Sequence, residues 1–128
     1  MADAKLKVTF LDIEVHKDGD PIDKGEIYWS LKVDGSVVTS RSSGNPYKIG
    51  SGGSITLDNS ATVTKSGAVG TNLVVSGSVS ERDSGVDETA PFSRSYTSGD
   101  NWGTGNPHSA HFADKNLDVT VNYIIERV

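Results

Sequence analysis

The chain of 128 residues contains no cysteine, which excludes disulfide bonds, thiolate catalysis, iron–sulfur clusters and thiolate zinc sites. Apolar residues are also few, at 34 % of the chain, and no apolar run approaches the about 20 residues that a transmembrane helix requires. Residues 1–5 lack the apolar segment of a secretory signal peptide. We therefore expect a soluble, cytoplasmic protein. A module of a larger exported protein would have the same features and would be extracellular.

Clustered positive charge is lacking as well. The 12 Lys and Arg residues are scattered singly among 17 Asp and Glu, and the formal net charge is −5. Without a basic stripe that follows phosphates, nucleic acid is excluded as a partner. The same scatter weakens any purely electrostatic attachment to anionic lipid.

Glycine is abundant instead, at 14 residues, and together with many serines and threonines it is typical of short strands joined by turns. No segment has a 3.6-residue apolar period with caps, so we expect no helix longer than about two turns. The length corresponds to a single domain over residues 1–128. The composition therefore predicts an all-β fold, an antiparallel β-sandwich of about seven to eight strands.

Alternation of apolar and polar residues locates these strands. Over residues 5–16 the apolar parity switches in the middle, which predicts a β-bulge near residues 10–12. Residues 26–33 alternate again, and Asp34-Gly35 predicts a type I′ hairpin turn before a returning strand. The remaining expectations are a short edge at 47–49, a hairpin of 54–57 and 61–64 turning at Asp58-Asn59, a strand at 72–80, brief pairing at 92–97, a loop over 98–111 and a final strand at 117–125.

Two acidic stretches, residues 18–26 and residues 81–88, interrupt the strands. Carboxylates crowded into one loop repel each other, and each lowers stability unless water or a cation compensates it. Calcium takes about six to eight oxygen ligands and favours acid-rich loops whose glycines let carbonyls turn inward. If the fold brings both stretches to one end, a calcium site is expected; otherwise they are ordinary solvated loops. The candidate ligands are Asp18, Asp20, Asp23, Glu81, Asp83 and Asp87, with Glu26 and Glu88 in reserve.

The two acidic stretches resemble the calcium-binding loops of C2 domains. Residues 18–29 place aspartates before an aromatic-bearing strand, as in the first loop of that family, and residues 79–92 have its second pattern of acid-x-Asp, a further acid and a strand. Glu81 stands where an aspartate is usual, and the Asp-Pro-Tyr signature of the first loop is absent. The resemblance implies a non-catalytic C2-like module that binds Ca²⁺, which stabilises the fold or mediates docking to a phospholipid surface or a protein partner. Ile22 and Val86 are the candidate apolar tips.

Two other functions remain open. The chain is alternatively a structural, assembly or adhesion subunit of phage or surface type, which meets partners through strand edges and Ser/Gly loops without metal. As a third function, a carbohydrate-binding module would stack a sugar on Trp102 while Asp100 and Asn101 bond its hydroxyls. The competing interpretation of Trp102 is a plug at one end of the core.

His108-x-x-His111-x-x-Asp114 has the spacing of metal ligands on a helical turn. The segment is loop-like, however, and lacks the glutamate of a metalloprotease motif, so surface histidines are the expected interpretation. No Gly-x-Ser-x-Gly elbow occurs, and no serine is tied to a histidine and an acid. We expect no enzymatic activity.

Overall fold

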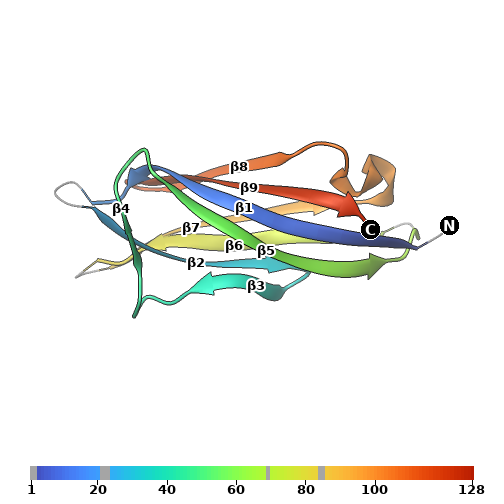
Figure 1. The fold of residues 1–128 in the computed structure, drawn as a ribbon, viewed down its shortest axis with the longest axis horizontal. Helices are drawn as coiled ribbons and strands as arrows, with labels where there is room; N and C mark the ends of the chain where they lie inside the picture. The colour runs from blue at the N-terminus through green and yellow to red at the C-terminus, as the bar shows by residue number, and fades with distance from the viewer. Residues whose placement is uncertain (1–2, 21–23, 69, 84–85) are drawn as a thin grey trace.

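The computed structural model describes residues 3–20, 24–68, 70–83 and 86–128. In this part of the chain nine strands and one short 3₁₀ helix form two facing antiparallel sheets (Figure 1). The elements are β1 (Ala4–Asp18), β2 (Gly25–Val33), β3 (Ser36–Arg41), β4 (Tyr47–Ile49), β5 (Ser54–Lys65), β6 (Leu73–Glu81), β7 (Glu88–Tyr96), η1 (Ser98–Gly103), β8 (His108–Asp114) and β9 (Leu117–Arg127). The expected all-β antiparallel sandwich is confirmed. No helix among the described residues is long and apolar enough to span a membrane.

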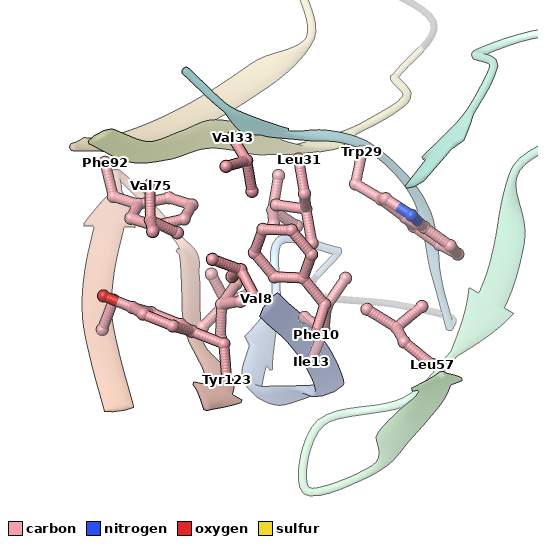
Figure 2. Packing of buried hydrophobic residues seen from close by; sticks show 14 of the residues in the cluster. Val8, Phe10, Ile13, Trp29, Leu31, Val33, Leu57, Val75, Phe92 and Tyr123 are labelled. Atoms are coloured by element: carbon pink, nitrogen blue, oxygen red, sulfur yellow. The ribbon is translucent and has the colours of Figure 1, made fainter. Parts of the chain in front are cut away.

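One sheet has the strand order β5-β1-β9-β8, and the other has β3-β2-β6-β7 with β4 beside the start of β2. Along β2, every second side chain is buried, as the alternation predicted. Figure 2 shows how Leu31 and Val33 of β2 face Val8, Phe10 and Ile13 of β1 across the interior. Burial of each such side chain contributes about 1.5–3 kcal/mol, so this interlayer core is the main source of stability.

Two register shifts bend β1. The first, between Phe10 and Asp12, is the predicted bulge. The second lies between Val15 and Lys17 and was not predicted. Each shift reverses which side of the strand faces the core, and the second one returns Asp18 to the inner side, where its exposed fraction is 6 %. A carboxylate is thereby placed at the end of the sandwich.

The hairpin predicted around Asp58-Asn59 is wrong, because β5 is one continuous strand of 12 residues. This strand lies at the edge of its sheet, beside β1. Asn59 lies opposite Phe10 and Thr56 opposite Asp12, so the extra residues of β5 are accommodated beside the β1 bulge. Exposed polar residues that usually form turns are tolerated there because one face of an edge strand meets water.

The expected loop over residues 98–111 is also wrong at its C-terminal end, where β8 begins at His108. β8 is an edge strand too, and its pattern is weak because only Ala110 is fully buried. Pairing with the strongly patterned β9 forms this strand. The Asp34-Gly35 turn is confirmed by its positive φ angles of 50° and 82°.

The proposed sugar-stacking role of Trp102 is wrong. Its side chain is only 2 % exposed and belongs to the core, so its ring face is not accessible to a sugar. Asp100 accepts a hydrogen bond from the Thr97 amide, and Asn101 accepts one from Arg127. Figure 1 places η1 beside the two termini, at the end of the sandwich away from both acidic stretches.

Candidate functional site

The two acidic stretches meet at one end of the sandwich. In Figure 1, β1 and β6 end and β2 and β7 begin at this same end. A Cβ atom added to Gly19 would lie 3.1 Å from Cγ of Glu81, so the stretches are in direct contact. We call the described carboxylates gathered here the acidic rim: Asp18, Asp20, Glu81, Asp83 and Glu88.

A close crossing of β1 and β2 holds the first stretch in place. A Cβ atom on Gly25 would lie only 2.5 Å from the carbonyl oxygen of Asp18, so this approach requires glycine. The amide of Asp18 donates to Oγ of Ser51 at 3.1 Å, and the amide of Asp20 donates to Oδ1 of Asp18 at 2.9 Å. An open pocket lies against this turn, and its lining residues are Lys17, Asp18, Gly19, Asp20, Ser51 and Asn116.

Glu81 lies at the centre of the rim, with an exposed fraction of 3 %. Burial raises the pKa of its carboxyl to about 7, and repulsion by Asp83, Asp20 and Glu88 adds to the effect. At neutral pH this carboxyl is therefore protonated about half of the time. Burial is the main cause, repulsion by the neighbouring acids is the second, and a bound cation would offset both.

Glu88 joins the rim to a third loop. Its Oε2 atom accepts hydrogen bonds from the amides of Asn116 and Leu117, at 2.9 and 3.0 Å. The side chain is 7 % exposed, and such charge-assisted bonds are about twice as strong as neutral ones. Glu88 thus fixes the β8–β9 turn against the rim, and this contact was not predicted.

Two predicted ligands have other partners. Oδ1 of Asp87 accepts from the amide of Asp83 at 3.0 Å and its Oδ2 accepts from the Tyr28 hydroxyl at 2.6 Å; both bonds lower the pKa of Asp87. Glu26 forms an ion pair of 3.3 Å with Arg82. Both carboxylates therefore already have partners within the protein. Asp23, a further predicted ligand, and the apolar tip Ile22 lie outside the described residues.

The rim carboxylates are near one another without forming a closed site. In calcium sites each oxygen lies about 2.3–2.6 Å from the ion, so two ligands of one ion are at most about 5 Å apart. Among the described residues, three acid or histidine ligand atoms lie within 4.8 Å of one another only at His16, His111 and Asp118.

The metal trio of His108, His111 and Asp114, which the spacing allowed but which was not expected, does not form among the described residues. Residues three apart in a strand point to opposite faces. His108 turns inward, stacks on Tyr123 and donates a hydrogen bond of 2.6 Å from Nε2 to the carbonyl oxygen of Gly103. Asp114 accepts from the amide of Thr89. His111 points outward instead and meets His16, which sequence spacing gives no means of finding.

Solved structures, but no curated protein sequences, are similar to this chain. No protein-family profile matches the chain, and no curated protein sequence is significantly similar to it. A solved structure described as a C2 domain superposes with a TM-score of 0.55 at 12 % identity, over 96 % of this chain and 98 % of that one. Human GIVD cytosolic phospholipase A2 in complex with methyl gamma-linolenyl fluorophosphonate superposes with a TM-score of 0.51 at 14 % identity.

The match to the phospholipase covers 99 % of this chain and 17 % of that protein, so the likeness concerns one part of the larger molecule. At these identities the comparisons establish the fold alone. The chain has a C2-like fold, as the resemblance of its two acidic stretches predicted.

Proposed function

We propose that this C2-like module is a non-catalytic docking unit that binds Ca²⁺ at the acidic rim. The observation that carries the proposal is Glu81, whose carboxyl has a pKa raised to about 7 by burial and, to a smaller extent, by three neighbouring acids. A buried charge surrounded by like charges is costly. Clusters of perturbed acids are typical of functional sites, where a ligand compensates the charge.

The residues present fit a hard cation. Asp18, Asp20, Glu81 and Asp83 would supply carboxylate oxygens, and Ser51 and Asn116 line the adjoining pocket. Such a set of oxygen donors suits calcium. When bound, the ion supplies positive charge that draws the carboxylates together and displaces the proton of Glu81.

Val86 supports a docking role for the same end of the molecule. It lies in the second acidic stretch, three residues after Asp83 in the β6–β7 loop, and 81 % of its surface is exposed. Burial of one valine stabilises a complex by about 1.5–3 kcal/mol, which is too little for stable attachment. The rim also repels an anionic surface when no cation is present. Docking to anionic phospholipid therefore depends on an ion shared between the rim and lipid phosphates.

Thermal unfolding with Ca²⁺, with Mg²⁺ and with chelator tests ion binding. At a free calcium concentration about 100 times the dissociation constant, binding adds about 2.7 kcal/mol to stability, which raises the midpoint by several degrees. Asp20→Asn and Asp83→Asn should each reduce the rise. Asp58→Asn, which removes an exposed acid in the middle of β5, is the matched control. Identical curves with Ca²⁺ and chelator would favour the metal-free structural subunit.

Sedimentation with phosphatidylserine-containing vesicles tests docking. We expect the chain to sediment with Ca²⁺ and to remain in solution with chelator. Val86→Ser should weaken sedimentation, while Val37→Ser, which changes a 55 % exposed valine beside the turn at the other end of β2, should not. Calcium-dependent stabilisation without sedimentation would restrict the ion to a stabilising role.

A further inference from the structure

A second cluster of ligand-type side chains lies outside the acidic rim. His16 of β1, His111 of β8 and Asp118 of β9 each offer one ligand atom, and these atoms lie within 4.8 Å of one another. Nε2 of His111 is 2.5 Å from Oδ1 of Asp118. The ring of His16 stands edge-on to that of His111, with centroids 5.5 Å apart. Two of the three histidines in the chain thus meet at one carboxylate.

Strand order brings these residues together. β1, β9 and β8 are consecutive in the four-stranded sheet, and His111 lies opposite Thr120, two residues after Asp118 on β9. His16 is the residue passed over in the register shift between Val15 and Lys17, and its side chain is exposed. The second bulge of β1 therefore both turns Asp18 inward and keeps His16 on the outer face.

A hydrogen bond orients the imidazole of His16. Its Nε2 atom lies 2.8 Å from Oγ1 of Thr120, so Nδ1 is the ring nitrogen that this bond leaves for an ion. Hydrogen bonds that orient ligating histidines in this way raise metal affinity. Lys17 is the neighbouring cation on β1, but it lines the rim pocket.

We propose that His16, His111 and Asp118 form a binding site for a borderline divalent transition-metal ion, Zn²⁺ above all. Imidazole and carboxylate are ligands that zinc accepts, and calcium prefers a shell made of oxygen alone. Tetrahedral zinc at its usual bond lengths places its ligand atoms about 3.4 Å apart. Small rotations of two exposed imidazoles reach that geometry without repacking the core.

An ordinary ion pair explains less of the arrangement. Contact between His111 and Asp118 alone would be a common surface ion pair, which contributes little to stability. A pair gives no reason for a second imidazole at the same place, oriented by its own hydrogen bond. With three protein ligands, the fourth position of the ion is open to water or to a group of another molecule. The ion would also tie together three strands.

The test uses the full chain without a polyhistidine tag, freed of metal and titrated with Zn²⁺ by calorimetry and with Co²⁺ by visible absorption. We expect one ion per chain and the absorption of a four-coordinate site. His16→Gln, His111→Gln and Asp118→Asn should each lower affinity at least tenfold, since even loss of an outer partner costs about 10–100-fold. His108→Gln, which changes the third histidine of the chain, should leave the affinity for Zn²⁺ unchanged. If that variant does not fold, Asp58→Asn serves as the control.

Imidazole NMR gives a direct readout on the unaltered protein. Zn²⁺ should shift the ring signals of His16 and His111 and leave those of His108 in place. Equal affinity in the His16→Gln/His111→Gln double variant, or no binding of either ion at millimolar concentration, would overturn the proposal. The rim variants Asp20→Asn and Asp83→Asn should keep the zinc isotherm intact, so the two metal proposals can fail separately.

Discussion

Replacing Glu81 with glutamine tests the electrostatic account of the acidic rim. The change keeps the size of the side chain and removes its charge. The pKa of Glu81 rises from 4.5 to about 7 on folding, so the folded state binds this proton more tightly than the unfolded state. Stability therefore falls as pH rises between these two values, because the folded chain must release a proton that the unfolded chain has already lost.

The size of this loss of stability follows from the difference between the two pKa values of Glu81. Each pH unit corresponds to about 1.4 kcal/mol, so the wild-type chain without metal loses about 3 kcal/mol between pH 4.5 and 7 through Glu81. Below pH 4.5 both states hold the proton and no loss occurs. Above pH 7 the loss is complete. For a small domain, 3 kcal/mol is a large share of a total of about 5–15 kcal/mol.

Urea unfolding in chelator between pH 4.5 and 8 measures this loss. Glu81→Gln should equal the wild type at pH 4.5 and exceed it by about 3 kcal/mol at pH 8. The difference between the two chains is the relevant quantity, because the histidines titrate in both and cancel. Glu126→Gln, at an exposed position of β9, should follow the wild type.

Parallel stability curves for the wild type and Glu81→Gln would refute the reasoning, since they would mean that Glu81 has the same pKa in both states. With Ca²⁺ at about 100 times the dissociation constant, the difference between the two chains at pH 8 should nearly vanish, because binding adds about 2.7 kcal/mol to the wild type. The wild type then gains the binding energy of the ion, and the variant lacks a carboxylate that would hold it.

Three further changes probe the surroundings of the rim and the packing of the sheets. Lys17→Gln removes an ammonium from the pocket wall and should raise calcium affinity several-fold in calorimetry, by about 1 kcal/mol; unchanged affinity would place the ion elsewhere. Glu88→Gln weakens two bonds to buried or partly buried amides and should lower the unfolding free energy by about 1–3 kcal/mol, with faster hydrogen exchange at the β8–β9 turn. Gly77→Ala would place a Cβ atom 2.2 Å from the carbonyl oxygen of Ser30, at a φ of 151°. It should cost about 2 kcal/mol or more in denaturant unfolding, whereas Gly44→Ala, in open space, should cost little.

The sequence predicts a strand well when the alternation of apolar and polar residues matches the alternation of buried and exposed side chains. β2 and β9 lie inside their sheets and keep an inward apolar face along their length. β5 and β8 were misjudged because they are edge strands, where polar residues such as Asp58 face water and pairing with a neighbour forms the strand. The alternation of side chains depends on neighbouring residues in the sequence, whereas the pairing of two strands depends on residues far apart in it.

The acidic rim was predictable in outline. Runs of carboxylates at the ends of strands indicate loops, and their crowding indicates a need for water or a cation. Which carboxylates face one another was not predictable, because that depends on partners far away in sequence. Glu26 is paired with Arg82 and Asp87 with Tyr28, while Glu88 supports a turn some 28 residues further on.

The amino-acid sequence by itself determined an all-β sandwich, its first bulge and the position of acids at strand ends, because each of these depends on the period and chemistry of neighbouring residues. The tertiary structure alone decided that Asp20 and Asp83 share an end, that Trp102 is buried, and that His16 meets His111 and Asp118. Those contacts arise from strand order and from a second bulge. Both are properties of the packed sheets, and no spacing along the chain encodes them.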